Sequence, residues 1–179
     1  MRTLRLKKGT MFFRVETKEK RKYDNPKFYS YFRDGRCDEK IWAKRCDRYC
    51  RFLRVVARRD LKLINVPYKS IMWAEDVTED DVKLAKTFVK LAKRVYKGNK
   101  DKIECVKKAV TDLILLKEGR FDCSELLNDW TLANLICKAG FDGMVRFVEG
   151  DIPNCYDEVA ICFPEDKLEV VYEEMIPLK

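Results

Sequence analysis

The sequence predicts a single α+β domain, and three observations lead to this fold class. Segments with strand patterns occupy both ends of the chain, and a helical segment from about residue 78 to residue 139 lies between them. Hydrophobic residues make up 46% of the 179 residues, which is enough for one sizeable core. No internal repeat or low-complexity segment divides the chain, so the domain is expected to span residues 1–179. We therefore expect a split mixed or antiparallel sheet with a helical middle.

The first third of the chain predicts strands separated by turn-rich segments. Residues 9–16, GTMFFRVE, have the pattern of a first strand, and Phe28–Phe32 has that of a short aromatic strand. Apolar residues at helical spacing predict a helix from about Glu39 to Cys50. The alternating stretch 51–66 predicts a strand or a broken strand, which Pro67 ends.

Capping signals predict three helices in the middle of the chain. Thr78, followed three residues later by Asp81, forms a capping box at the start of the first helix. Asp101, with a glutamate three residues later, repeats this start signal for the second helix. The third helix is expected after Ser124, with Gly140 as the residue that closes it.

The C-terminal third predicts the strands that complete the core. Met144–Val148 and Glu158–Phe163 have strand patterns, and Leu168–Tyr172 is a further candidate. Asp142-Gly143 is predicted as a turn after the third helix. The buried-looking strand at 158 opens with a carboxylate, which either marks a strand end at the surface or is a catalytic group at the lip of a cleft.

Cysteine and histidine content excludes several kinds of chemistry. The chain has eight cysteines, no secretory signal and no apolar run of bilayer length, which favours free thiols in a cytoplasmic protein without membrane partners. No Cys-x-x-Cys pair occurs, so no metal site is expected, and Cys137 and Cys162 have the pattern of small core residues. The absence of histidine rules out Ser-His-Asp and Cys-His catalysis, so acid–base chemistry must use carboxylates, lysine, tyrosine or cysteine.

Positive charge is concentrated in the first part of the chain. Residues 1–62 carry 21 Lys and Arg against 8 Asp and Glu, a net charge of +13, which leaves −5 of the total of +8 for residues 63–179. Such asymmetry indicates a surface for polyanions, for instance nucleic acid, nucleotide phosphates or anionic lipid. A solvated basic surface without a ligand explains the same pattern.

The chain carries the motifs CKAGFDGMV and DEVAICFPEDKLE near its C-terminus and KKGTMFFRV and PKFYSYF near its N-terminus. Together these short motifs resemble the ADP-ribosyltransferase-like fold family. The segment CKAGFDGMV, followed by a loop and by DEVAICFPEDKLE, is similar to the last third of that fold in members from phages and large DNA viruses. KKGTMFFRV is similar to the first strand of the family, and PKFYSYF to the second. The resemblance covers about half of the chain and leaves the helical middle uncovered. It implies that NAD is the co-substrate, with an unknown protein or nucleic-acid acceptor.

The arginine–serine–glutamate version of the family implies a specific site. It places Arg14 on the first strand and Ser30 on the second, and Glu158 as the catalytic carboxylate that stabilises positive charge on the ribose when the nicotinamide bond breaks. Arg14 would hold phosphate or ribose oxygens, while Tyr29 or Tyr31 would stack on nicotinamide.

Two departures from the family pattern bear on which acceptor receives the ADP-ribose and on which branch of the family the chain resembles. Arginine-modifying members carry Glu-x-Glu, whereas this chain has tyrosine two residues before Glu158, which leaves the acceptor open. The related RES-type toxins share an arginine after an aromatic residue, here Phe13-Arg14, but the chain has only a faint similarity to their Gly-Arg-Trp segment.

Other interpretations remain open for the same residues. Arg14 is also explained as a surface residue on an edge strand, Glu158 as a strand end, and Tyr29 and Tyr31 as core aromatics. A basic nucleic-acid-binding protein without catalysis would use the aromatic residues among the first 62 to stack bases. A non-catalytic pseudoenzyme of the same fold is a third alternative.

Overall fold

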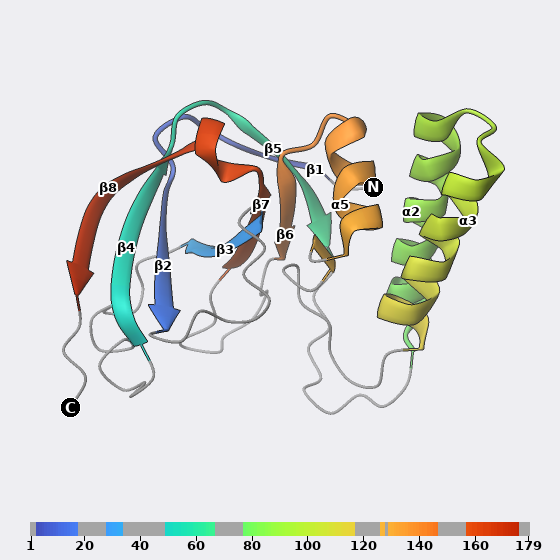
Figure 1. Ribbon diagram of the computed structural model, residues 1–179, viewed down its shortest axis with the longest axis horizontal. Coiled ribbons are helices and arrows are strands. Elements are labelled where there is room, and N and C mark those ends of the chain that lie inside the picture. The colour runs from blue at the N-terminus through green and yellow to red at the C-terminus, as the bar shows by residue number, and fades with distance from the viewer. Residues whose placement is uncertain are drawn as a thin grey trace.

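The computed structural model describes residues 3–17, 28–33, 49–66, 77–116, 126–127, 129–146 and 157–175 (Figure 1). Five strands come first in the chain: β1 (Thr3–Leu6), β2 (Met11–Thr17), β3 (Phe28–Arg33), β4 (Tyr49–Ala57) and β5 (Leu61–Val66). Three helices follow: α2 (Glu79–Tyr96), α3 (Lys100–Val110), which continues as a π-helical turn at Thr111–Leu115, and α5 (Trp130–Lys138). The last elements are β6 (Gly143–Arg146), β7 (Asp157–Cys162), a 3-10 turn at Pro164–Asp166 and β8 (Leu168–Met175).

The strands form one sheet with the order β1-β5-β6-β7-β3-β2-β4-β8. The β5–β6 pair is parallel and the other neighbouring pairs are antiparallel. Because the helical segment connects β5 to β6, the parallel pair is the crossover that such a connection permits. The α+β class and the mixed sheet are therefore confirmed.

Among the described residues, the β2–β3 junction has the fewest registered pairs in this sheet. In the described residues, the only pair in register between these two strands is Phe13 with Phe32. The neighbouring β2–β4 pair, by contrast, is in register from Met11 to Thr17. Hydrogen bonds thus join the eight strands into one sheet, whereas the sequence predicts a split one, but the part of the β2–β3 junction that the structure describes is one pair wide.

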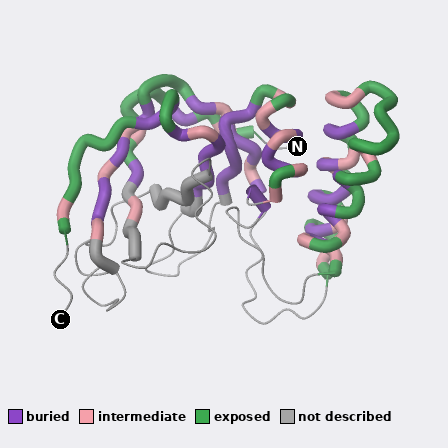
Figure 2. Tube along the Cα trace, in the orientation of Figure 1, coloured by how far each residue is buried: buried purple, intermediate pink, exposed green. Residues whose placement is uncertain are grey.

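Two hydrophobic clusters lie on opposite sides of the sheet. Alternate residues of β7 divide between them, with Ala160 and Cys162 in one cluster and Val159 and Ile161 in the other. The larger cluster joins β5, β6 and β7 to the three helices, and the buried stripes of α2 and α5 face it in Figure 2. The smaller cluster fills the inside of the curved sheet, where Phe12 of β2 meets the residues of β5, β6 and β7. The curvature visible in Figure 1 lets strands distant in sheet order share this core.

The first helix begins where the sequence predicts it. Thr78 is the N-cap of α2, and its side chain and that of Asp81 form the reciprocal bonds of a capping box. The second helix begins earlier than predicted. Asn99, not Asp101, is its N-cap, because the Asn99 side chain accepts from the backbone N–H of Lys102 and satisfies an otherwise unpaired donor.

The third helix ends where the sequence predicts, but it begins at a different residue. Ser124 lies outside the described residues, and α5 is capped by Asp129, whose carboxylate accepts from the backbone N–H groups of Thr131 and Leu132. Gly140 follows the helix with φ of 80°, the left-handed conformation in which glycine carries no penalty from Cβ.

Asp142-Gly143 is not the predicted turn. Gly143 is the first residue of β6, and a Cβ atom there would lie 2.0 Å from the carbonyl oxygen of Ala160 on β7. The glycine is required because two strands approach closely, and the reversal of direction occurs at Gly140 instead.

The predicted helix from Glu39 to Cys50 is wrong at its C-terminal end. Tyr49 and Cys50 begin β4, which pairs along its length with β2 and β8, and residues 39–48 lie outside the described ranges. Tertiary pairing with two neighbours thus outweighs the helical spacing of the apolar residues. Stretch 51–66 is a broken strand, interrupted between Ala57 and Leu61.

Candidate functional site

The three strands that carry the sequence-predicted site are neighbours in the sheet. Strand β3 lies between β7 and β2, with Ser30 opposite Ala160 and Phe32 opposite Glu158. Arg14 on β2 pairs with Leu53 of β4. The backbones of Tyr29, Ser30, Tyr31 and Glu158 are described, whereas their side chains lie outside the description.

The register separates these positions between the two faces of the sheet. Positions 30 and 158 belong to the face of Ala160, because Ser30 pairs with Ala160 and Glu158 lies two residues before it. Arg14 lies two residues after Phe12, whose side chain belongs to the cluster on the opposite face. The sheet therefore places positions 30 and 158 on one face, two residues apart in register, and position 14 on the other face.

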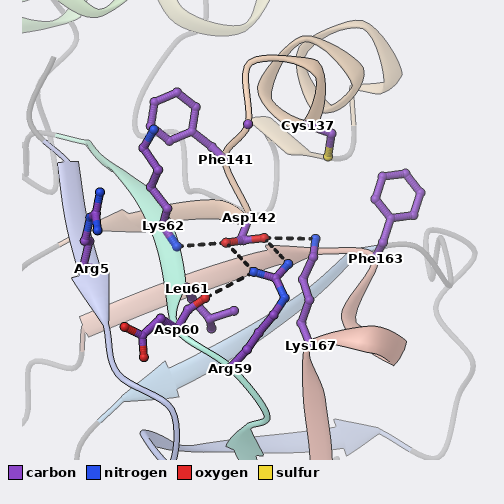
Figure 3. A pocket seen from close by; sticks show the side chains of 11 residues that line it. Arg5, Arg59, Asp60, Leu61, Lys62, Cys137, Phe141, Asp142, Phe163 and Lys167 are labelled. Atoms are coloured by element: carbon purple, nitrogen blue, oxygen red, sulfur yellow. Dashed lines mark hydrogen bonds and ion pairs between the residues drawn. The ribbon is translucent and has the colours of Figure 1, made fainter.

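A basic cavity lies at the opposite end of β7, away from Glu158 (Figure 3). Its volume is about 540 Å³, within the range of roughly 300–1,000 Å³ typical of small-molecule sites. Residues of β1, β5, the end of α5 and the turn after β7 line it. Its charged lining side chains are four cations and two carboxylates: Arg5, Arg59, Lys62, Lys167, Asp60 and Asp142. The cavity thus has an excess of two positive charges.

Asp142 is the centre of the polar network in this cavity. The left-handed Gly140 redirects the chain from α5 to the sheet, where the backbone N–H of Asp142 donates to the carbonyl of Lys62 over 2.8 Å. The Asp142 carbonyl accepts from the N–H of Cys162, also over 2.8 Å. These two bonds hold Asp142 between β5 and β7, immediately before β6 begins.

The Asp142 carboxylate, which is 12% exposed, binds cationic and backbone donors. Arg59 donates from Nη2 to Oδ1 over 2.7 Å and from Nη1 to Oδ2 over 3.3 Å, in the fork geometry that guanidinium groups prefer. The backbone N–H of Lys62 donates to Oδ2 over 2.8 Å, and Lys167 Nζ lies 3.7 Å from Oδ1. One carboxylate therefore fixes an arginine and a lysine at the wall of the cavity, as the dashed lines in Figure 3 show.

Lys167 is largely buried, with a side chain that is 11% exposed. Its position follows from the turn after β7, where Phe163 is left-handed with φ of 49° and the N–H of Lys167 donates to the carbonyl of Pro164 over 2.9 Å. The ammonium group donates to the carbonyl of Cys162 and lies 5.8 Å from the centre of the Phe163 ring. Asp142, a carbonyl and an aromatic ring together compensate for the desolvation of this charge.

The remaining charges of the cavity are more exposed. The Asp60 carboxylate is directed to the β1–β2 turn, where it accepts from the N–H of Lys8 over 2.9 Å and from Lys7 Nζ over 3.2 Å. The bond from Lys8, with the charge of Lys7, holds the pKa of Asp60 below its usual value. Within the described ranges, Arg5 and Lys62 form no ion pair, and Lys62 Nζ lies 4.5 Å from the centre of the Phe141 ring.

Two thiols lie at the side of the cavity. Cys137, in the last turn of α5, lines the cavity and is half-buried, whereas Cys162, at the end of β7, is buried. Cys137 packs against the larger hydrophobic cluster, to which Cys162 belongs. Among the described residues, no three His, Cys, Asp or Glu side chains converge as metal ligands would. No helix in the described ranges has both the length and the hydropathy needed to cross a membrane.

Sequence reasoning missed most of this cavity. Arg5, Arg59 and Lys62 belong to the basic first 62 residues, which the charge count singles out without indicating where they meet. The sequence indicates Asp142 only as part of a turn, and Lys167 has no local signal. The pairing of β5 with β1 and with β6, together with the turn at Pro164, brings these residues to one cavity.

Comparisons of the chain with protein-family models, with curated proteins and with solved structures find no match. The function is therefore inferred from the residues and their geometry.

Proposed function

We propose that the basic cavity binds a small phosphate-bearing ligand of nucleotide size. The observation that carries this proposal is that Asp142 fixes the Arg59 fork and the Lys167 ammonium at the cavity wall. Cations fixed in this way bind phosphate without losing further side-chain entropy. Because Arg5 and Lys62 add charge that no carboxylate ion-pairs within the described ranges, the cavity attracts an anion despite the presence of Asp142.

The size and the lining of the cavity favour a nucleotide over free phosphate. A volume of about 540 Å³ exceeds what a single phosphate group fills, and the rings of Phe141 and Phe163 provide apolar surface beside the cations. Such a combination of a few charged groups with aromatic walls is typical of nucleotide and cofactor sites. The charge asymmetry of the sequence, which indicates a polyanion partner, supports the same ligand class.

Calorimetric titration of the full chain with pyrophosphate and with NAD tests this proposal. Arg5→Gln and Lys62→Gln, each of which removes one cation while leaving the Asp142 network intact, are expected to weaken binding about tenfold each, or roughly 1.4 kcal/mol. Lys90→Gln, on the exposed side of α2, is the matched control and should bind like the parent. Equal affinity of all four proteins, or no binding at low salt, would refute the proposal.

NAD-dependent ADP-ribosyl transfer is a second candidate, supported by a separate observation. Strands β2, β3 and β7 are neighbours, and Ser30 and Glu158 belong to one face of the sheet, as a site shared between two strands requires. The position of Arg14 on the other face argues against a site that combines it with Ser30 and Glu158. Glu158 lies roughly 16 Å of extended strand from Phe163, so this site and the basic cavity would be at opposite ends of β7.

Nicotinamide release from NAD distinguishes the two candidates. Release by the parent and by Lys62→Gln, with loss in Glu158→Gln, would support transfer at the Glu158 site. Binding of NAD or pyrophosphate without release would leave a binding protein or a pseudoenzyme. Salt-dependent binding of long single-stranded nucleic acid, with weak binding of both small ligands, would instead favour the nucleic-acid-binding alternative.

A further inference from the structure

Helix α2 presents a row of cations to solvent that the proposed ligand site does not use. From residue 83 to residue 100 the sequence holds seven lysines and arginines and no carboxylate. Five of them form what we call the basic stripe, and all five are exposed: Lys86, Lys90, Lys93, Arg94 and Lys97. None of the five lines the basic cavity, and the hairpin of α2 and α3 lies at one end of the molecule (Figure 1). The net charge of −5 for residues 63–179 conceals the stripe, because the carboxylates of that part lie outside residues 83–100.

Helical geometry places the basic stripe on one side of α2. With about 100° of rotation per residue, its five positions fall within an arc of about 100°. The buried residues of the helix, among them Phe88 and Ala92, are centred on the opposite side, where they pack into the larger hydrophobic cluster (Figure 2). At a rise of about 1.5 Å per residue, the stripe extends roughly 16 Å from Lys86 to Lys97, the C-cap, with one cation about every 4 Å.

The basic stripe has no anionic partner among the described residues. Lys83, one turn earlier, pairs with Glu79 and Asp80, whereas none of the ion pairs within the described ranges includes a cation of the stripe. Cations four residues apart on a helix, such as Lys86 and Lys90, repel each other. The helix dipole favours positive charge only in the last turn, so it does not account for these two mid-helix lysines. A bound polyanion would relieve this repulsion.

We propose that the basic stripe contacts the phosphate backbone of a duplex nucleic acid without reading its sequence. Each strand of a duplex presents one phosphate about every 3.4 Å along the axis, close to the spacing of the cations. Lysine and arginine contacts to phosphate fix the position of a protein on a duplex and carry no sequence information. The inference does not rest on the ligand proposed for the cavity, because the two sites share no residue.

The other side chains of α2 favour a duplex over a single strand or a membrane. All exposed residues of α2 are charged, so the helix offers no exposed aromatic ring on which an unpaired base could stack. It also offers no exposed apolar side chain that would enter the interface of a membrane. The partly exposed ring of Tyr96 already has cationic neighbours, because Nζ of Lys102 and Nζ of Lys138 lie 5.8 and 5.6 Å from its centre.

Fluorescence anisotropy of the full chain with labelled duplex DNA and duplex RNA of about 15 base pairs tests the proposal, because such a duplex is longer than the stripe. Single-stranded DNA of the same length and phosphatidylserine vesicles are the comparison probes. Lys90→Gln/Lys93→Gln removes two cations of the stripe, and Lys107→Gln/Lys108→Gln, which removes two exposed cations of α3, is the matched control of equal net charge. Glutamine is a good helix former and all four positions are exposed, so both variants are expected to fold.

The salt dependence of binding measures the number of phosphate contacts. With five contacts, the logarithm of the affinity should fall against the logarithm of the salt concentration with a slope of about −4.5. Between about 50 and about 200 mM salt, the parent and the α3 control should therefore lose about 500-fold in affinity, and Lys90→Gln/Lys93→Gln, with three contacts left, about 40-fold. Lys90→Arg/Lys93→Arg keeps both charges and should behave like the parent.

Several results would overturn the proposal. Equal salt slopes for the two double glutamine variants would show that the stripe has no special role. Tighter binding of the single strand than of either duplex, or binding of the vesicles alone, would assign the stripe to another partner. Absence of duplex binding by the parent at low salt would refute it without any variant. Binding of either duplex with the expected slopes supports it, and the tighter of the two identifies the source of the phosphates.

Discussion

Replacing Asp142 by asparagine keeps the shape of the side chain but removes the charge that organises the cavity. The amide oxygen of asparagine can still accept from the N–H of Lys62, whereas the amide N–H₂ group faces donors of Arg59. Lys167 is left largely buried with a carbonyl partner and no carboxylate. The substitution thus affects two charges that differ in their exposure to water.

The expected loss of stability follows from that difference. The Arg59 side chain is 50% exposed, so its ion pair is screened and contributes about 1 kcal/mol. Lys167, with 11% exposure, loses a charged partner at a cost of about 2 kcal/mol. We therefore expect Asp142→Asn to reduce the free energy of unfolding by about 3 kcal/mol. This lies at the lower end of the values of roughly 3–5 kcal/mol for breaking a buried ion pair.

Urea denaturation followed by circular dichroism measures this loss. With a slope of about 2 kcal/mol per M, the midpoint should fall by roughly 1.5 M while the slope stays constant. Asp112→Asn, at an exposed aspartate, is the matched control and should stay within about 0.5 kcal/mol of the parent. Lys167→Met added to Asp142→Asn should recover part of the stability, because it removes the unpaired charge. Asp142→Asn with the stability of the control would refute the role given to this carboxylate.

Three further predictions concern the glycine of β6, the stability of the protein at low pH and the thiol of Cys137 in the cavity. Gly143→Ala should destabilise by about 3 kcal/mol or more in urea, because its Cβ would lie 2.0 Å from the Ala160 carbonyl oxygen; stability equal to the parent would contradict that contact. The pKa of Asp60 is lower in the folded protein than its unfolded value of 3.8, so its contribution to stability is present above pH 3.8 and is lost as the pH falls through the folded pKa. Asp60→Asn should therefore lose less stability on acidification than the parent, as measured by thermal melts at several pH values. The pH midpoint for iodoacetamide alkylation of Cys137 should be lower in the native protein than in urea, and pyrophosphate should slow the native reaction.

The sequence was most informative where a local signal decides the structure. The capping box at Thr78 and the left-handed Gly140 depend on residues within one helical turn, so both are read correctly from the chain. Tyr49 and Cys50 show the limit of such reading, because pairing with β2 and β8 decides their conformation and neither strand is local. Gly143 shows another limit, since an Asp-Gly pair is compatible both with a turn and with a close approach of two strands.

The candidate site was less predictable than the fold. Arg5, Lys62 and Lys167 meet only through pairing of β1 with β5 and through the turn after β7, and each alone has the pattern of a surface residue. The face to which a strand residue belongs depends on register, which separated Arg14 from Ser30 although both lie on adjacent strands. Short motifs predict the identity of strands better than they predict the convergence of side chains.

The single pair Phe13–Phe32 that joins β2 to β3 in the described residues has a consequence for how the molecule opens. In the described residues backbone pairing is reduced there to one pair, and the smaller cluster, with Phe12 and Val55 on one side of it, adds side-chain packing between β2, β4 and β8 and the rest of the sheet. Under force applied between residues 13 and 32, that three-stranded unit should therefore detach at a lower load than β4 would from β2. The described part of the sheet is therefore expected to open first at this junction, where side-chain packing has to replace most of a hydrogen-bond ladder.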